Sequence, residues 1–185
     1  KQVMVNQAAP EKRYYIKEQV AKATNLVSGS KYVISLHNGT NVTDDCWKIN
    51  DNDQLSLSRV NSKDQYGFTS EYVFEIVNGA YSTPAQGGDI NYDSRKRVCL
   101  RSLKDNTMIS TSLYLGATST SSAMNFLFCT QWATDTDKEN RKDFDIWAQI
   151  YESGQGNVWK TLYWNSSSSQ MKFGTVGEGG SSRKW

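Results

Sequence analysis

Proline, histidine and long apolar runs are scarce in this sequence of 185 residues, and each scarcity excludes a class of protein. With two prolines and no low-complexity block, the chain is neither a collagen nor a long disordered tail. No apolar run approaches the roughly 18 residues of a membrane-spanning helix. The 21 Lys and Arg nearly balance the 19 Asp and Glu. Without a basic stripe for a phosphate backbone, we expect no nucleic-acid partner.

Cysteine and histidine are too few for most metal and catalytic sites. Cys46, Cys99 and Cys129 form no Cys-x-x-Cys pair, so neither a zinc ribbon nor a thioredoxin-type site is present. We expect small buried thiols, at most one disulfide, no metal site and no cofactor. His37, the only histidine, follows a predicted strand, and we expect it on the surface or in a turn.

Serine, threonine and asparagine together supply 50 residues, beside 22 aromatic ones, which is typical of β-rich extracellular domains. From Leu26 onward, short β-type runs alternate with clusters of Gly, Asn, Asp and Ser. We therefore predict a single all-β domain over residues 25–185, preceded by an N-terminal extension or linker at 1–24. The predicted strands are 31–36, 55–58, 72–77, 97–101, 108–110, 113–115, 124–129, 144–151, 158–164 and 171–174.

These strands fall into three sets, each opening on a strong strand and ending near an aromatic residue: Phe74, Phe126 or Trp185. Three four-stranded units predict a β-trefoil, whose closed barrel leaves few exposed sheet edges. We expect the last strand to be incomplete at Trp185. A β-sandwich or jelly roll gives the same strand spacing and is the alternative. The predicted core residues are Tyr32, Ile34, Phe74, Ile76, Val98, Leu100, Phe126, Phe128, Phe144 and Ile146.

Residues 26–34 read Leu-Val-Ser-Gly-Ser-Lys-Tyr-Val-Ile, an L-x-S-G-x-x-Y-x-I pattern. The pattern resembles the start of ricin-like β-trefoil modules in secreted multi-domain proteins of gut Bacteroidetes, and the resemblance covers residues 25–185. It implies a secreted, periplasmic or cell-surface location, other domains in a longer chain, and a role near glycans. The chain departs from ricin-type lectins because no unit contains Gln-x-Trp, so their sugar sites do not carry over.

Residues 157–165 combine aromatic and polar side chains more densely than any other segment. Proteins bind sugars with flat aromatic faces, flanked by amides and hydroxyls that bond the ring hydroxyls. A period of two puts Trp159 and Tyr163 on one face of a strand, as a stacking platform. Either flanking asparagine would bond hydroxyls. The predicted ligand-binding residues are Asn157, Trp159, Tyr163, Trp164 and Asn165.

Other candidate sites are weaker. Trp47 and Trp132 border polar loops and are lesser candidates for an exposed aromatic. The acidic segments 51–53 and 135–139 do not fit an EF-hand, so we expect solvated loops there. No nucleophile or phosphate-loop motif occurs, and sequence nominates no catalytic residue. The sequence therefore predicts a non-catalytic carbohydrate-binding module, with a structural or adhesion domain that binds protein partners as the alternative.

Overall fold

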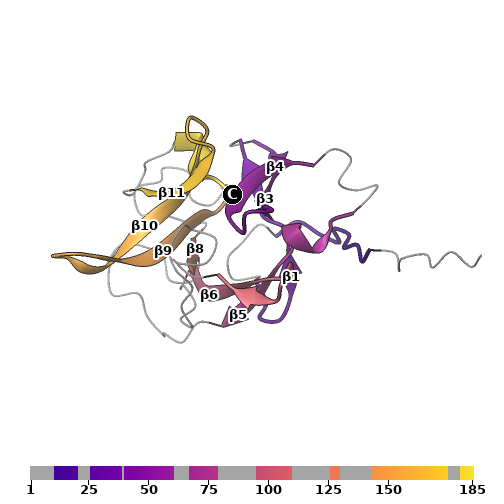
Figure 1. Cartoon of the computed structure of the whole chain (residues 1–185), viewed down its shortest axis with the longest axis horizontal. Helices are drawn as coiled ribbons and strands as arrows, with labels where there is room; N and C mark the ends of the chain where they lie inside the picture. Colours follow the sequence, from indigo (N-terminus) through magenta and orange to yellow (C-terminus); the bar gives the residue numbers. More distant parts are fainter. Residues whose placement is uncertain are drawn as a thin grey trace, which may run out of the picture.

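The computed structural model describes residues 11–20, 26–38, 40–60, 67–78, 95–109, 126–129, 143–174 and 180–185. This part of the chain is all-β, as predicted, with short 3-10 helices at η2 (Ser70–Tyr72) and η4 (Gly180–Arg183) (Figure 1). The strands are β1 (Lys31–Tyr32), β2 (Ser35–His37), β3 (Val42–Ile49), β4 (Leu55–Arg59), β5 (Phe74–Asn78), β6 (Arg95–Ser102), β7 (Thr107–Met108), β8 (Phe126–Cys129), β9 (Asp145–Glu152), β10 (Gly156–Asn165) and β11 (Gln170–Gly174).

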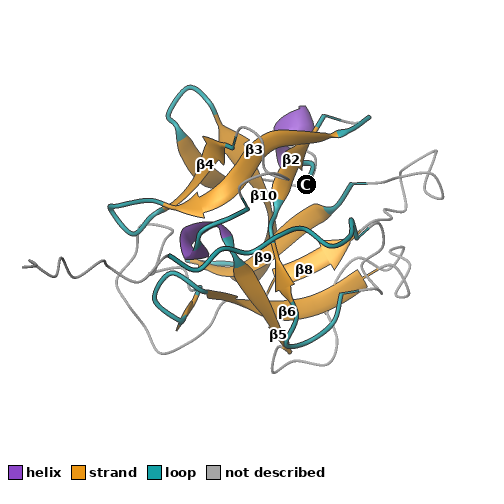
Figure 2. Ribbon diagram, turned by 90° about the vertical axis from the view of Figure 1, so that its right-hand side faces the viewer, coloured by secondary structure: helices purple, strands orange, loops and turns teal. Residues whose placement is uncertain are grey.

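The strands form two antiparallel sheets, seen from the side in Figure 2. The larger has the order β1-β5-β6-β8-β9-β10-β11, with β7 paired to β6, and the smaller has the order β2-β3-β4. The predicted strand 31–36 is therefore divided, since its first residues pair with β5 and its last with β3. This crossing at Val33 and Ile34 joins the two sheets.

Lys184 and Trp185 close the arrangement. The backbone N–H of His37 in β2 donates to the carbonyl of Lys184 at 2.8 Å, and Trp185 exchanges two backbone hydrogen bonds with Phe144, just before β9. The backbone of Lys184 also forms an isolated antiparallel β-bridge with Asp145, the first residue of β9. Pairing thus runs from β1 through β5, β6, β8 and β9 to residues 184–185 and back to β2, as a closed ring of strands.

The predicted core is confirmed at nine of its ten positions, which are buried in one cluster. Tyr32 is half-buried, because its hydroxyl lies at the edge of the core and accepts a hydrogen bond from the backbone of Val27. All three unit-closing aromatics, Phe74, Phe126 and Trp185, are buried in the cluster. Trp185 was not among the predicted core residues, so its burial adds to the predicted set.

Trp47 is fully buried, so its prediction as an exposed aromatic is wrong. Its ring makes edge-to-face contacts with Phe74 at 5.8 Å and with Trp185 at 5.5 Å between centroids. The error follows from an unpredicted strand, β3, in which the weak strand formers Asp44 and Asp45 precede Trp47. The other lesser candidate, Trp132, lies outside the described residues.

His37 is also buried, at 2 % exposure, so its predicted surface position is wrong. The expected turn does follow it, because the Asn38 side chain accepts hydrogen bonds from the backbone of Thr40 and Asn41. What sequence could not show is that Lys184 and Asp143, distant in the chain, lie against this strand end.

The segment 11–20 lies against a second, smaller cluster that contains Cys46, Phe68 and Val73. Tyr14 packs on this cluster and pairs with Phe68 through two backbone hydrogen bonds of 2.7 and 2.8 Å. Gly67 makes the approach possible. A Cβ on this residue would stand 2.9 Å from the Tyr14 carbonyl oxygen, and its φ of +71° also favours glycine.

Candidate functional site

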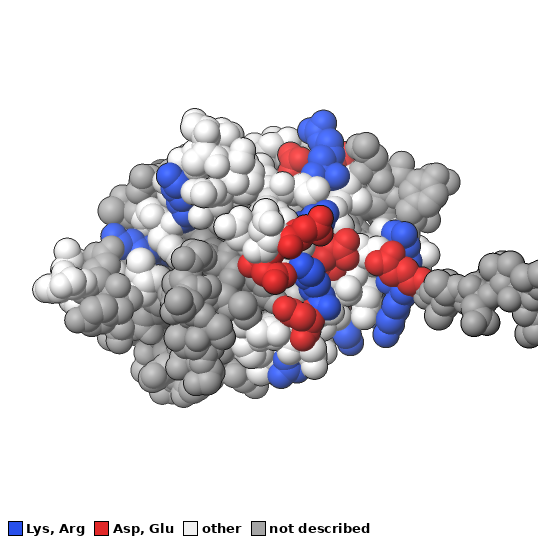
Figure 3. Space-filling view, viewed as in Figure 1, with Lys and Arg blue, Asp and Glu red and all other residues white. Residues whose placement is uncertain are grey.

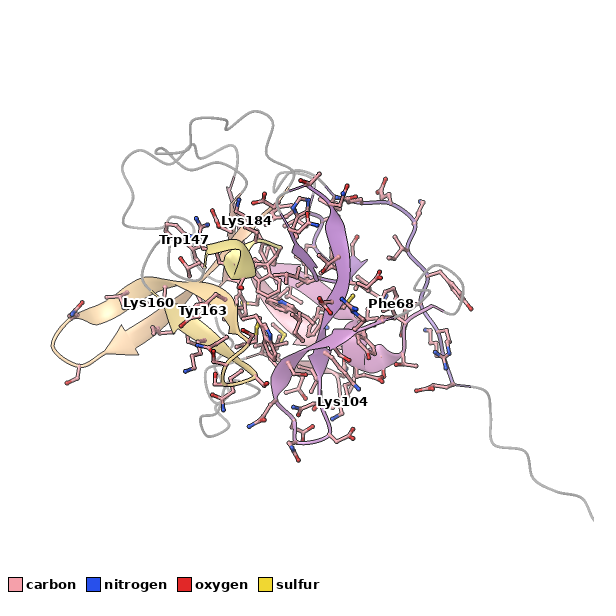
Figure 4. All side chains as sticks on the ribbon, turned by 90° about the horizontal axis from the view of Figure 1, so that it is seen from above. Phe68, Lys104, Trp147, Lys160, Tyr163 and Lys184 are labelled. Carbon is pink, nitrogen blue, oxygen red and sulfur yellow. The ribbon has the colours of Figure 1, made fainter. Side chains whose placement is uncertain are left out.

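The candidate site lies on the hairpin of β10 and β11, which neighbours β4; Tyr163 and Phe68 are well separated in Figure 4. Cross-strand pairs join Asn165 to Gln170 and Tyr163 to Lys172. The intervening turn, residues 166–169, is exposed. Its shape is fixed locally, because the Asn165 side-chain oxygen accepts a hydrogen bond from the backbone of Ser168 at 3.0 Å.

The two faces of this hairpin have different environments. Leu162 is fully buried in the main core, and Trp164 packs partly against it. Their cross-strand partners Phe173 and Met171 pack on the same core. Since successive side chains alternate, the other face carries Tyr163, Asn165, Gln170 and Lys172. We call these four residues the hairpin face.

Accessibility increases along this face toward the turn. Thr161, two residues before Tyr163, is 1 % exposed, and its cross-strand neighbour Trp147 is also buried. The Thr161 hydroxyl has no hydrogen-bond partner among the described residues. Tyr163 is half-buried and Gln170 is exposed. An external ligand therefore reaches the turn end of the hairpin and not its base.

The structure brings together two of the five predicted ligand-binding residues, Tyr163 and Asn165, on the hairpin face. Trp164 lies on the opposite face, against the core. Asn157 and Trp159 belong to β10, where they pair with Tyr151 and Gln149, but their side chains lie outside the described set.

Sequence analysis missed the β11 residues of the face, Gln170 and Lys172. A signal for them was present. Once Ser166–Ser169 is taken as a four-residue hairpin turn, antiparallel register places Gln170 opposite Asn165 and Lys172 opposite Tyr163. The face then combines one aromatic ring, two amides and one ammonium group, which suits a ligand rich in hydroxyl groups.

A second polar cluster lies where residues 184–185 close the ring of strands. His37 Nδ1 is 3.9 Å from the carboxylate of Asp143, and Arg183 donates to Asp145 at 2.6 Å. His37, Asp143 and Asp145 are all buried. Buried charges of this kind need partners, and removal of one partner is strongly destabilising. The cluster thus ties η4 and the residues after it to β2 and β9.

The acidic loop 51–53 is exposed, as predicted, and a lysine distant in the chain lies against it. Lys104 donates to the Asp53 carboxylate at 2.8 Å and to the Asn50 carbonyl at 2.9 Å. The bond to Asp53 raises the pKa of Lys104. Within the described ranges, no three His, Cys, Asp or Glu residues are placed to hold a metal ion. Segment 135–139 lies outside these ranges.

The surface seen in Figure 3 has acidic side chains gathered beside basic ones, and the remaining basic side chains are scattered. Ion pairs account for part of this mixing, such as Arg101 with Glu75 at 3.6 Å and Arg59 with Asp45 at 3.5 Å. Such mixing leaves no extended basic stripe on the described part of this face, in keeping with the balanced composition.

The chain matches no protein-family model, no curated protein and no solved structure. None of the helices in the described segments has the length and apolar character of a membrane span.

Proposed function

We propose that this chain is a non-catalytic carbohydrate-binding module with a β-trefoil fold, belonging to a secreted, periplasmic or cell-surface protein with further domains. The ring of strands supports the trefoil. In that fold the first and last strands of each unit build a barrel, and the middle two form a hairpin that caps it. Here β5, β8 and residues 184–185 occupy the last-strand positions, while β3–β4 and β10–β11 occupy hairpin positions of the first and third units.

The observation that carries the binding proposal is the composition of the hairpin face. Tyr163 offers an amphipathic ring that stays half-accessible although its strand is anchored in the core. Stacked rings of this kind bind the C–H faces of sugars. The hydrogen bond from Ser168 uses one acceptor position of the Asn165 amide and neither of its N–H donors, which can bond to sugar hydroxyls. Gln170 adds a second amide.

The position of the single histidine supports a role without catalysis. His37 is enclosed where the ring of strands closes, beside Asp143, and its burial keeps it from external substrates. A general base must reach the proton that it removes within hydrogen-bond distance. We therefore assign His37 to the structure of the closure.

A glycan array, followed by calorimetric titration with the best-bound oligosaccharide, tests the proposal. One stacking ring contributes about 1–2 kcal/mol, so we expect millimolar affinity for a single sugar unit and avidity from repeated sites. Tyr163→Ala should lower the affinity about tenfold or more. Tyr15→Ala is the matched control, since Tyr15 is a 64 % exposed tyrosine that belongs to the N-terminal segment and not to the hairpin.

Both variants should keep the far-ultraviolet circular dichroism of the parent. Binding that survives Tyr163→Ala in a folded protein would contradict the hairpin site. The same titration with Trp159→Ala tests the other residue of the predicted stacking platform. Titrations with Asn157→Ala and Trp164→Ala test two further predicted ligand-binding residues.

A structural or adhesion domain that binds protein partners is the second candidate. It is favoured by exposed apolar side chains in the N-terminal segment, where Tyr15 is 64 % and Ile16 47 % exposed. Exposed apolar groups that lie together are typical of protein contacts. A folded protein that binds nothing on the glycan array would favour this role over carbohydrate binding.

A further inference from the structure

The third-unit hairpin carries charge of one sign. Between residues 153 and 177 the sequence contains Lys160 and Lys172 and not a single Asp or Glu. This contrasts with the composition of the whole chain, in which the charges nearly balance. On the hairpin face itself, Lys172 is the one charged residue, and a positive group attracts anions.

Lys172 lies at the end of the hairpin face that is farther from the turn. It is the direct cross-strand partner of Tyr163, and such partners have Cβ atoms about 4.5–5.5 Å apart. This separation is close to the width of one sugar ring. A pyranose stacked on Tyr163 therefore lies within reach of the Lys172 ammonium, which sits on a flexible four-carbon stem.

The charge of Lys172 is not neutralised by any described carboxylate. Four arginines and one lysine elsewhere in the described ranges do have such partners. The paired residues are Arg13 with Glu11, Arg59 with Asp45, Arg101 with Glu75, Lys104 with Asp53, and Arg183 with Asp145. Lys172 forms no ion pair of this kind within the described ranges, and its side chain is partly exposed.

We propose that the hairpin face selects sugars that carry an anionic group, a carboxylate or a sulfate, with Tyr163 stacking on the ring and Lys172 binding the anion. The inference rests on the proposed carbohydrate-binding function and narrows its ligand class. A hydroxyl group gives Lys172 an ordinary hydrogen bond, whereas a carboxylate or sulfate gives a charge-assisted bond about twice as strong. Preference for the anionic sugar follows from this difference.

An array that carries neutral, uronic-acid, sialylated and sulfated glycans separates the possible outcomes. We expect the bound glycans to be acidic, with signals that fall as sodium chloride rises from 0.05 to about 0.5 M, because salt screens a surface pair. Binding confined to neutral glycans would overturn the inference and leave the proposed function standing. An array without any binding would remove the proposed function itself. If the bound glycans carry uronic or sialic acid, the recognised anion is a carboxylate. If the bound glycans are sulfated, the recognised anion is a sulfate.

Two matched variants then show which lysine binds the anionic group of the sugar. Lys172→Gln should weaken binding of the preferred acidic oligosaccharide about fivefold, the effect of one partly exposed ion pair, and should leave a neutral analogue unchanged. Lys160→Gln removes one positive charge from β10 where that strand pairs with β9, and strand alternation places Lys160 on the opposite face from Tyr163. Equal losses in both variants would show that general positive charge, and not Lys172, attracts the anion, and would overturn the assignment.

Discussion

Trp185 should be among the most sensitive positions of the domain, because its side chain and its backbone both contribute to the closure. It is buried, its indole ring lies edge-to-face on Trp47, and its Nε1 donates to the Leu162 carbonyl at 3.2 Å. Truncation of a buried aromatic side chain to alanine costs about 3–5 kcal/mol of folding free energy. This cost already includes most of the energy of the lost contact with the Trp47 ring. The lost hydrogen bond adds about 1 kcal/mol.

We therefore expect Trp185→Ala to lower the free energy of unfolding by about 4 kcal/mol and the melting temperature by roughly 8–16 °C. Trp185→Phe keeps an aromatic ring and loses the N–H donor, so it should cost about 1–2 kcal/mol. Urea unfolding followed by far-ultraviolet circular dichroism measures both changes without relying on the fluorescence of six tryptophans. A loss below about 1 kcal/mol for Trp185→Ala would refute the assignment of this residue to the core.

Four further predictions concern other parts of the chain. Gly67→Ala should detach the N-terminal segment, since its Cβ would meet a backbone oxygen at 2.9 Å; limited proteolysis should then cleave residues 11–20 faster than in the parent. Denatured, unreduced protein should show three thiols, because neither Cys46 nor Cys99 is in a disulfide, which leaves the third cysteine nothing to pair with inside the chain. Burial raises the pKa of the Cys99 thiol, so the free energy of unfolding should fall above about pH 8.5, where the thiol ionises in the unfolded chain. Urea unfolding at several pH values should show a smaller decrease of this free energy with pH for Cys99→Ala than for the parent. Lys104→Ala should change stability by less than about 1 kcal/mol in the same assay, because the Lys104–Asp53 pair is exposed.

The core was predictable from sequence because it depends on alternation within single strands. Phe74 and Ile76, or Val98 and Leu100, reveal their common face by a spacing of two residues, whatever the rest of the chain does. β3 escaped prediction because its first half contains two aspartates, which strands disfavour, and only the second half enters the core. Trp47 was then taken for a residue at the border of a loop.

The site was partly predictable for a similar reason. Tyr163 and Asn165 lie in one strand, so the sequence places them on one face, but Lys172 joins them only through the register of the hairpin. The burial of His37 depends on contacts with Asp143 and Lys184, more than 100 residues away in the chain. No local pattern encodes such contacts, because they exist only once the chain has folded.

The closure between β2 and residues 184–185 also has a consequence for synthesis on the ribosome. His37 and Lys184 are separated by most of the chain, so the hydrogen bond between them cannot form until residue 184 has left the exit tunnel. Until then the edge of β2 stays unpaired on that side, and an unpaired edge invites association with other chains. Contacts of such long range also make folding slow, because loop entropy is lost before the contact forms. The nascent domain should thus be most prone to aggregation just before residues 184–185 emerge from the ribosome.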